Sequence, residues 1–550
     1  MAATLTINGQ TVQASADLSL FDQAEAMCID VPTSCRKQGK CKECMVDVVE
    51  GMDALSPRTE AEQHLKGNFR LSCQTHVIRE SGQVRCQTMR RGTMRIESQA
   101  LGLPGHNRSV ELDPAVTRDG DRIFIDGVEV DQRAGPIYGI AMDLGTTTVV
   151  LRLIDLENGE LIADTSFENP QRFGGSEVMS RIAYDSDHPG KLLMRTLAGY
   201  LTHAIEKFPV DPKSIYQMVV VGNSTMRDLF FRQNVHSIGQ SPYRSITEIE
   251  MAEGKRATTS LVQTGMRSLL PIHPKARVYG APIISGHVGA DAAACMLAVD
   301  MAHEERLIAV MDIGTNTELI VGNRHRILAA SCPAGPAFEG GAIACGMPAL
   351  EGAIEEVEIA DDESIRLRVI GDGKPEGICG SGLVDILSEL LRTGRMNAMG
   401  RFADDVRRVT LYRNDVLDEG VFLLENDVNE LAQAKGANVA GLQVVFSSYG
   451  IDFDDIDVFY LAGGFGRHLN LDASKRIGLV PNLDATKIVQ AGNTAIEGAT
   501  IALLSKSKRQ ELEDLVKKVE HCRLETHPSF FDFFVEGCQF KPVESIPCAK

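Results

Sequence analysis

The sequence predicts an α/β protein with a small α+β domain at its N-terminal end. From about residue 137 onward, apolar strand-like runs alternate with helical stretches, as is typical of α/β folds. The first 93 residues instead combine short strands, one helix and a cysteine-rich loop. At 550 residues the chain has room for roughly three or four folding units.

Composition and charge separate the same two regions. Hydrophobic residues make up 43% of the chain and charged residues 24%, which is ordinary for a globular protein. Residues 1–93 carry eleven basic and eleven acidic side chains, so the net charge of −19 falls entirely on the remainder. This acidic balance argues against nucleic acid as a partner, because nucleic-acid binding usually needs a basic face.

Nothing in the sequence indicates a membrane or a secretory route. No run of about 18 apolar residues is present, and the opening "MAATLTINGQ" lacks the basic and apolar segments of a signal peptide. We therefore expect a cytoplasmic protein. In that compartment the 13 cysteines are expected to be metal ligands and buried thiols rather than disulfides.

The N-terminal elements follow in order from local signals. Asn8-Gly9, flanked by alternating apolar residues, predicts a β-hairpin. Ser19 is a candidate N-cap for a helix in "LFDQAEAMCI", and "CMVDVVEG" predicts a strand. We assign residues 1–93 to this domain. The turn-rich residues 94–136 are predicted to be a linker with a small hairpin at 122–130, and the alternative that they belong to the next domain remains open.

Four cysteines in the first domain have the spacing of a metal centre. Cys35, Cys41 and Cys44 form a C-x5-C-x2-C run, and Cys73 follows 28 residues later. Zinc sites usually pair two C-x2-C units, and only one is present, so zinc is the less favoured alternative. Plant-type 2Fe–2S ferredoxins use C-x4-C-x2-C with a distant fourth cysteine. The longer first gap resembles the adrenodoxin-like branch of the ferredoxins, which implies a β-grasp fold, a 2Fe–2S cluster and a role in electron transfer.

The loop around these cysteines is also basic and contains one glycine. Gly39 is expected to let the backbone approach the cluster closely, and nearby Arg36, Lys37, Lys40 and Lys42 to offset the cluster's negative charge.

A second pattern occurs twice in the larger region. Residues 139–155 and 308–323 share the order apolar strand, Asp-x-Gly-Thr-x-Thr, apolar strand, with Asp143 and Asp312 separated by 169 residues. Such a repeat indicates two related halves. Glycine and threonine at a strand turn direct backbone N–H groups and hydroxyls towards phosphate oxygens, and the aspartates are suited to holding Mg²⁺ through water and orienting an attacking water.

These hairpins and "YLAGGFGRHLN" (460–470) resemble the phosphate and adenosine motifs of the superfamily that includes actin, sugar kinases and the large heat-shock ATPases. The resemblance implies a two-lobed ATPase with duplicated ribonuclease-H-like halves, at 137–306 and at 307–550 with a C-terminal tail. It implies that ATP is bound by Gly145, Thr146, Thr147, Gly314, Thr315, Asn316, Gly463, Gly464 and Gly466, with Asp143 and Asp312 catalytic.

Four further glycine-rich stretches are candidates for lining the cleft between the lobes or a partner surface. They span residues 219–226, 284–292, 331–343 and 377–385. Each alone is also compatible with a plain structural turn. At the C-terminal end, 509–522 is predicted to be an amphipathic helix, and the phenylalanine-rich 529–540 is predicted to dock on the core.

The order of modules resembles that of the reductive activators of corrinoid-dependent enzymes, over essentially the whole chain. That resemblance implies an ATP-hydrolysing iron–sulfur protein that takes an electron from an upstream donor. It implies transfer of one electron to the Co(II) corrinoid of a cobalamin-type protein or methyltransferase, restoring Co(I). Three alternatives remain: a small-molecule kinase, a redox-sensing chaperone of the same ATPase superfamily, and an activator of a radical dehydratase.

Overall fold

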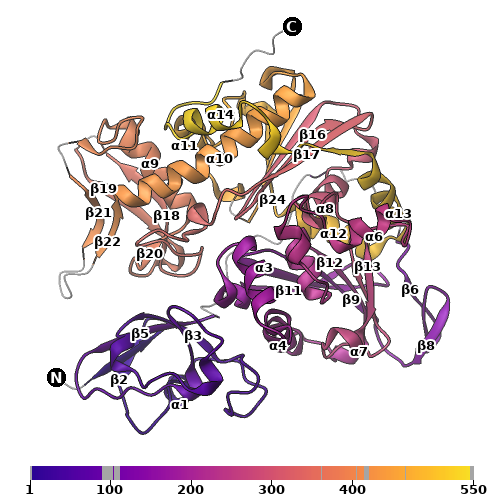
Figure 1. Ribbon diagram of the computed structural model, residues 1–550, viewed down its shortest axis with the longest axis horizontal. Helices are drawn as coiled ribbons and strands as arrows, with labels where there is room; N and C mark the ends of the chain where they lie inside the picture. Colours follow the sequence, from indigo (N-terminus) through magenta and orange to yellow (C-terminus); the bar gives the residue numbers. More distant parts are fainter. Residues whose placement is uncertain are drawn as a thin grey trace.

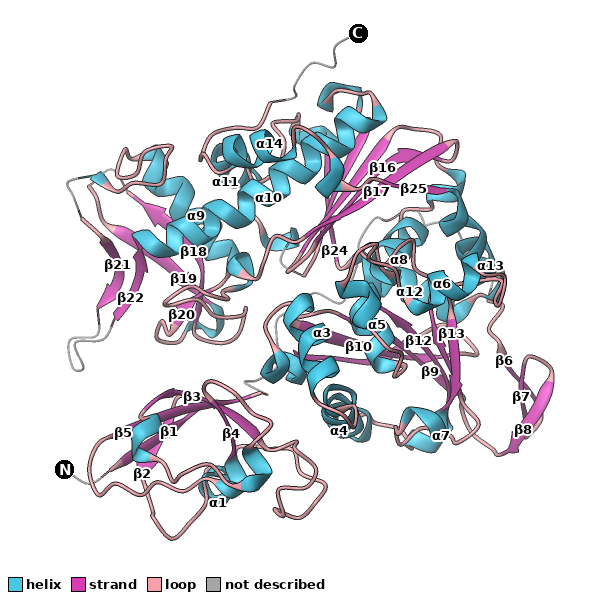
Figure 2. Ribbon diagram, in the orientation of Figure 1, coloured by secondary structure: helices cyan, strands magenta, loops and turns pink. Residues whose placement is uncertain are grey.

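The computed structural model describes residues 3–89, 103, 112–360, 362–403, 406–413, 420–464 and 466–544. A small N-terminal domain lies beside two larger lobes, each built on its own sheet (Figures 1 and 2). Among the residues that the structure describes, no helix combines the length and apolarity that crossing a bilayer requires.

The N-terminal domain is a five-stranded mixed sheet with one helix. Its elements are β1 (Thr4–Ile7), β2 (Gln10–Gln13), α1 (Leu20–Ala26), β3 (Met45–Glu50), β4 (Phe69–Leu71) and β5 (Gln83–Thr88), in the sheet order β2-β1-β5-β3-β4. The predicted hairpin is confirmed, because Asn8 and Gly9 both adopt positive φ between β1 and β2. Ser19 caps α1 in a reciprocal capping box with Asp22, as the sequence predicts.

Only part of the predicted linker lies within the described residues. From residue 112 onward it contains a small antiparallel sheet of β6 (Val116–Asp119), β7 (Arg122–Ile125) and β8 (Val128–Gln132). The β7–β8 pair is the hairpin predicted at 122–130, and β6 adds a third strand to it.

The first lobe is a six-stranded sheet covered by helices. Its strands are β9 (Tyr138–Leu144), β10 (Thr148–Asp155), β11 (Leu161–Glu168), β12 (Ile215–Val221), β13 (Leu261–Thr264) and β14 (Arg277–Gly280). Its helices are α3 (Val178–Asp187), α4 (Leu192–Glu206), α5 (Ser224–Phe230), α6 (Ile246–Ala252), α7 (Gly265–Ser268) and α8 (Ala290–Ala298). Strand order is β11-β10-β9-β12-β14-β13, with β9, β10 and β11 antiparallel and β12 parallel to β9.

The second lobe repeats this arrangement. Its main sheet contains β15 (Ile308–Ile313), β16 (Thr317–Asn323), β17 (Arg326–Cys332), β23 (Val458–Ala462), β24 (Ile488–Gly492) and β25 (Val519–His521), in the order β24-β23-β15-β16-β17-β25. The first three strands are again antiparallel, and β23 is parallel to β15. The two halves implied by the repeated hairpin are therefore present.

Additional elements belong to the second half of the sequence. They are β18 (Ala353–Ile359), β19 (Ile365–Val369), β20 (Gly377–Ile378), α9 (Gly380–Arg392), β21 (Arg408–Arg413), β22 (Gly420–Leu424), α10 (Glu425–Tyr449), α11 (Leu471–Ile477), α12 (Thr494–Leu504), α13 (Lys506–Leu515) and α14 (Phe530–Gly537). The helix predicted at 509–522 ends earlier than expected, because residues 519–521 pair with β17 as β25. In the phenylalanine-rich segment, α14 packs on α10, while Phe531 stays exposed.

Helix α12 belongs to the second half in sequence and to the first lobe in space. It packs against α8 and against β9, β10 and β12 (Figure 1). A buried ion pair fixes this contact, with 2.8 Å between Arg152 Nη1 on β10 and Glu497 Oε2 on α12. The two lobes are thus joined by more than the chain connection at residues 306–307.

Candidate functional site

The four predicted cluster ligands come together from two parts of the N-terminal domain. Cys35, Cys41 and Cys44 lie in the loop between α1 and β3, and Cys73 lies in the 3-10 turn after β4. The thiols of Cys35 and Cys41 are hydrogen-bonding neighbours, as are those of Cys44 and Cys73. Cys44 and Cys73 are buried, while Cys35 and Cys41 are partly exposed.

Backbone N–H groups of the loop point at these sulfur atoms. Cys35 accepts hydrogen bonds from the N–H groups of Gln38, Lys40 and Cys41, and Cys73 accepts one from Gly39. Gly39 adopts φ +66°, and an added Cβ would lie only 3.0 Å from the Gln74 side chain. The glycine therefore allows both the turn and the close approach. N–H donors of this kind stabilise thiolates and are a known means of tuning iron–sulfur clusters.

The spacing of the sulfurs fits a cluster better than a single ion. A tetrahedral zinc with Zn–S bonds of about 2.3 Å brings its sulfurs to roughly 4 Å from one another. The four sulfurs are instead neighbours in two pairs, Cys35 with Cys41 and Cys44 with Cys73, as expected when each of two irons is held by two thiolates. The donor set therefore fits the predicted 2Fe–2S cluster.

One of the basic residues expected to offset the cluster's charge has other partners. The Lys37 ammonium forms ion pairs with Asp22 at 2.7 Å and Glu25 at 2.8 Å on α1. The charges of all four thiols act on Lys42, whose ammonium donates to the Ala61 carbonyl.

The two predicted phosphate hairpins face each other across one cavity. Asp143 is the penultimate residue of β9 and Asp312 is the penultimate residue of β15, so each precedes its own glycine–threonine turn. The hydroxyls of Thr147 and Thr315 are 2.7 Å apart and both donate to the carboxylate of Glu339. All predicted nucleotide-site residues line this cavity except Gly466, which lies beside it with its carbonyl accepting from Gln490.

The adenosine motif borders the same cavity. Gly463 has φ +109°, and an added Cβ would lie 2.3 Å from the Ile313 carbonyl oxygen, so only glycine fits against the second hairpin. Gly464 has open space in front of it. Gly464 therefore leaves room for a ligand next to the phosphate hairpins.

Five carboxyl groups line this cavity, and two of them are the predicted catalytic aspartates. Burial raises the pKa of Asp143 to about 6, although a hydrogen bond from Asn493 opposes the shift. Burial and then the charge of Asp143 raise the pKa of Asp312 to about 7. Buried carboxylates that repel one another favour a divalent cation between them, so these residues fit Mg²⁺.

The other three carboxyl groups are absent from the sequence prediction. Burial raises the pKa of Asp291 to about 7, and burial also raises the pKa values of Glu318 and Glu339. Asp291 and Glu339 lie within the glycine-rich stretches 284–292 and 331–343, so a cleft role was among the predicted options for them. Glu318 lies inside a buried strand, and no sequence signal distinguishes it.

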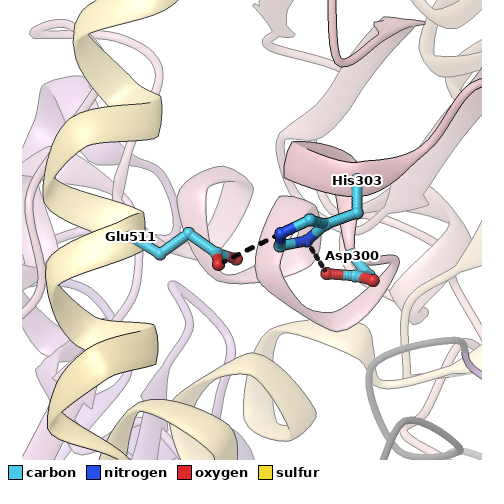
Figure 3. A group of neighbouring side chains, drawn as sticks. All are labelled: Asp300, His303 and Glu511. Carbon is cyan, nitrogen blue, oxygen red and sulfur yellow. Dashed lines mark hydrogen bonds and ion pairs between the residues drawn. The ribbon is translucent and has the colours of Figure 1, made fainter.

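A separate group of possible metal ligands lies away from both sites. Asp300, His303 and Glu511 approach one another where the segment after α8 meets α13 (Figure 3). His303 Nδ1 is 2.8 Å from Asp300, and the Lys508 ammonium is 3.5 Å from the same carboxylate. Because a lysine already supplies positive charge there, we interpret the group as an ion-pair network.

Comparison with known proteins gives three matches to family profiles. Residues 5–77 match the 2Fe-2S iron-sulfur cluster binding domain, residues 138–304 match the RACo middle region, and residues 306–548 match the C-terminal domain of RACo, the ASKHA domain.

Individual relatives cover most of the chain. The corrinoid activation enzyme RamQ of Eubacterium limosum is 33% identical over 447 residues, covering 76% of this chain and 73% of that protein. The [Co(II) methylated amine-specific corrinoid protein] reductase of Methanosarcina barkeri is 26% identical over 433 residues, covering 72% of this chain and 76% of that protein. A solved structure, the reductive activator for corrinoid, iron-sulfur protein, superimposes with a TM-score of 0.71 at 25% identity, covering 100% of this chain and 99% of that one.

Proposed function

This chain belongs to the family of reductive activators of corrinoid proteins, and from that premise we propose that it restores Co(I) in a corrinoid partner by ATP-dependent transfer of one electron. The observation that carries the proposal is the union, in one chain, of a four-cysteine ferredoxin site and a two-hairpin nucleotide cleft. An upstream donor is needed to re-reduce the cluster after each transfer.

Each cluster residue has a defined part in the proposal. Cys35, Cys41, Cys44 and Cys73 would hold a 2Fe–2S cluster, which supplies single electrons. The N–H groups of the loop stabilise its negative charge, and the partly exposed Cys35 and Cys41 mark the side nearest to solvent.

The cleft residues divide into binding and catalytic roles. Gly145, Thr146, Thr147, Gly314, Thr315 and Asn316 would bind phosphates, while Gly463 and Gly464 would receive the nucleoside, with Gly466 supporting that turn. Asp143 and Asp312 would hold Mg²⁺ and orient the attacking water. We assign Glu339 to the same machinery, because it accepts from the threonines of both hairpins.

ATP is needed because the electron transfer is unfavourable on its own. Each 100 mV of mismatch between donor and cobalt costs about 2.3 kcal/mol per electron. Binding and hydrolysis of ATP offset a mismatch of this kind by favouring a complex in which the cobalt accepts the electron.

The partner is proposed to be a corrinoid protein or methyltransferase, as the names of the relatives indicate for those proteins. We also place the protein in the cytoplasm. The twelve cysteines of the described residues are all free, which agrees with a reducing compartment.

The test uses the anaerobically purified protein, a reductant and a candidate corrinoid protein. The expected result is conversion of the Co(II) absorption spectrum to that of Co(I) only when Mg-ATP is added. Unchanged cobalt across several corrinoid proteins, despite an intact cluster and ATP turnover, would refute the proposal. Phosphorylation of a small molecule would favour the kinase alternative instead.

A further inference from the structure

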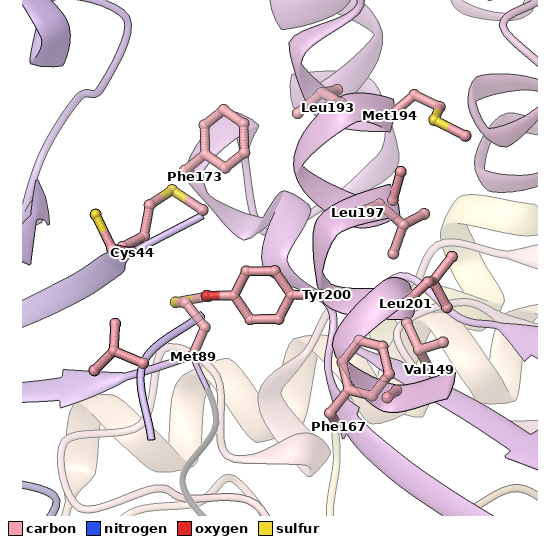
Figure 4. Close-up of a cluster of buried hydrophobic side chains, with 14 of the residues drawn as sticks. Cys44, Met89, Val149, Phe167, Phe173, Leu193, Met194, Leu197, Tyr200 and Leu201 are labelled. Atoms are coloured by element: carbon pink, nitrogen blue, oxygen red, sulfur yellow. The ribbon is translucent and has the colours of Figure 1, made fainter. Parts of the chain in front are cut away.

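The ferredoxin domain (residues 3–89) contacts both ATPase lobes in this structure. Its cluster loop and β3 lie against the first lobe, and its β1–β2 turn reaches the second. Figure 4 shows the first of these contacts, with the Tyr200 hydroxyl pointing from α4 towards the side of the interface that carries Cys44 and Met89.

The cluster loop itself forms the centre of the first contact. The buried Tyr200 hydroxyl donates to the Glu43 carbonyl at 2.9 Å, and Glu43 lies between the cluster ligands Cys41 and Cys44. At Gly199 of α4, an added Cβ would lie 2.6 Å from the Glu43 side chain. The loop therefore packs directly on α4, and this face of the cluster domain is closed to any other protein.

A second set of bonds joins β3 to the first phosphate hairpin. Arg172, in the 3-10 turn after β11, forms ion pairs with Glu168 and, at 2.5 Å, with Asp47 of the ferredoxin domain. Nearby, the Asn169 side chain donates to the Gly145 carbonyl at 2.8 Å, and its backbone N–H donates to the Thr147 carbonyl at 2.7 Å. Asn169, which bonds to the phosphate hairpin, is therefore only three positions before Arg172, which forms the cross-domain ion pair.

The contact with the second lobe is smaller and lies at the far end of the ferredoxin domain. An added Cβ at Gly9 would lie 3.2 Å from the Glu376 carboxylate. The charge of Arg85 on β5 also acts on Glu376. The ferredoxin domain thus contacts both lobes. It keeps both contacts only while the relative orientation of the lobes stays the same.

We propose that this docked arrangement is a nucleotide-sensitive resting state, and that binding of Mg-ATP loosens the ferredoxin domain and uncovers its cluster loop. The proposal rests on the nucleotide cleft assigned under the proposed function and adds the coupling between that cleft and the ferredoxin domain.

The direction follows from the hydrogen bonds that the threonines of the two hairpins make. Thr147 and Thr315 each donate their single hydroxyl proton to Glu339, so phosphate oxygens that accept from these hydroxyls compete with Glu339 for the same protons. A shift of Thr147 is passed to Asn169 and Arg172 through the bonds described above. A change in the relation of the lobes also strains the contact at Gly9. Both effects weaken docking, and thermodynamic linkage requires that docking weaken ATP binding by the same factor.

Hydrogen–deuterium exchange on the full-length protein with its cluster intact tests this directly. Samples without nucleotide, with Mg-AMP-PNP and with Mg-ATP separate binding from turnover. We expect protection of peptides covering 143–148 and 312–317, with exchange in 41–50 and 192–206 faster by about fivefold or more. Protected hairpins with unchanged or slower exchange at the interface would overturn the inference.

A matched pair of variants isolates the cross-domain bond. Asp47→Asn removes the buried partner of Arg172, whereas Asp30→Asn removes an exposed partner of Lys207 at the edge of the same interface. We expect Asp47→Asn to speed interface exchange without nucleotide and to tighten ATP binding about fivefold, with Asp30→Asn close to the parent protein. The absorption spectrum confirms that the cluster is retained.

The coupling and the nucleotide site can be refuted separately. Unaltered ATP affinity in Asp47→Asn, with normal ATP turnover, overturns the coupling and leaves the proposed function intact. Absence of any ATP protection or turnover in the parent protein overturns the nucleotide site and the coupling together.

Discussion

Cys73 is the predicted cluster ligand most distant in sequence from the other three, and neighbouring residues hold it in place. It is buried in a 3-10 turn, accepts from the Gly39 N–H and lies 3.4 Å from the Gln74 amide nitrogen. The spacing of the four cysteines is what predicts the set, and the fold brings the four side chains together. The sequence does not show which basic residues of the loop offset the cluster's charge, because Lys37 pairs with α1 through contacts that only the fold creates.

Replacing Cys73 tests the cluster at the level of one atom. We expect Cys73→Ser to abolish the visible absorption and the electron paramagnetic resonance signal of the reduced cluster, because serine replaces a thiolate ligand. The exposed Cys28 is the matched control, and Cys28→Ser should keep both signals. Loss of signal in Cys28→Ser, or its retention in Cys73→Ser, would contradict the ligand assignment.

The cleft contains two carboxyl groups that the sequence predicts and three that it does not. Asp143 and Asp312 belong to a repeated motif, so the sequence predicts them directly. Asp291, Glu318 and Glu339 arrive from α8, β16 and the loop after β17, and only folding brings them to one cavity. A glycine-rich neighbourhood is a weak signal for such residues, since plain turns share it.

Replacing Asp312 should separate activity from stability. We expect Asp312→Asn to lower ATP turnover by on the order of 100-fold or more, because a group that positions the attacking water is lost. The metal-free variant should nevertheless melt at a higher temperature than the parent at pH 8, since one of several repelling buried carboxylates is gone. Steady-state hydrolysis and thermal melts in chelator check both effects, with the exposed Asp454→Asn as control. Parent-like turnover in Asp312→Asn would exclude a catalytic role.

At the scale of elements, local signals predicted strands and turns well and helix ends less well. The Asn8-Gly9 turn and the Ser19 cap depend on nearby residues alone, so the sequence contains all that determines them. The helix predicted to continue to residue 522 stops at Leu515, because Val519 to His521 gain backbone bonds to β17. Pairing with a strand nearly 200 residues away leaves no mark in a local helical pattern.

Helix α9 offers a pair of carboxylates with opposite pKa shifts. Burial against β18 raises the pKa of Asp385 to about 6, whereas bonding to Arg392 lowers the pKa of Glu389. Because the pKa of Asp385 is raised in the folded state, the stability that this residue contributes at low pH is lost as the pH rises through about 6. Because the pKa of Glu389 is lowered, the stability that this residue contributes is present at neutral pH and is lost on acidification.

Variants of these two residues should therefore change stability in opposite directions. Asp385→Asn should stabilise the protein at pH 8 by on the order of 1 kcal/mol, with the gain vanishing near pH 4. Glu389→Gln should destabilise it at pH 8, with the loss shrinking as the pH falls towards 4. Chemical denaturation at several pH values measures both. Shifts of the same sign would show that burial and ion pairing do not control these groups as described.

At the scale of the molecule, the duplicated hairpin predicted two similar halves but not how they are joined. Five strands of each sheet follow the same order, as the internal repeat implies, while the sixth strand lies at opposite edges of the two sheets. Helix α12 then returns from the second half to cover the first sheet, where Arg152 and Glu497 form their buried pair. Each of these two residues is ordinary in its local sequence, so this link becomes visible only in three dimensions.

Breaking this pair should destabilise the whole ATPase unit. Both side chains are about 95% buried, with exposures of 5% and 6%. Glu497→Ala leaves the Arg152 guanidinium buried without its carboxylate, although Thr500 still accepts one of its bonds at 3.1 Å. We expect a loss of about 3–5 kcal/mol in the free energy of unfolding, measured by denaturant titration of the ATPase transition.

The exposed pair of Arg326 and Glu520 provides the comparison, since its side chains are 42% and 58% exposed. Glu520→Ala should cost at most about 1 kcal/mol, because water and salt screen the pair. Combining Arg152→Met with Glu497→Leu should recover most of the stability that Glu497→Ala loses, since apolar groups then fill the space without a buried charge. If the double variant is no more stable than Glu497→Ala, the loss comes from disrupted packing of α12 and not from the unpaired arginine.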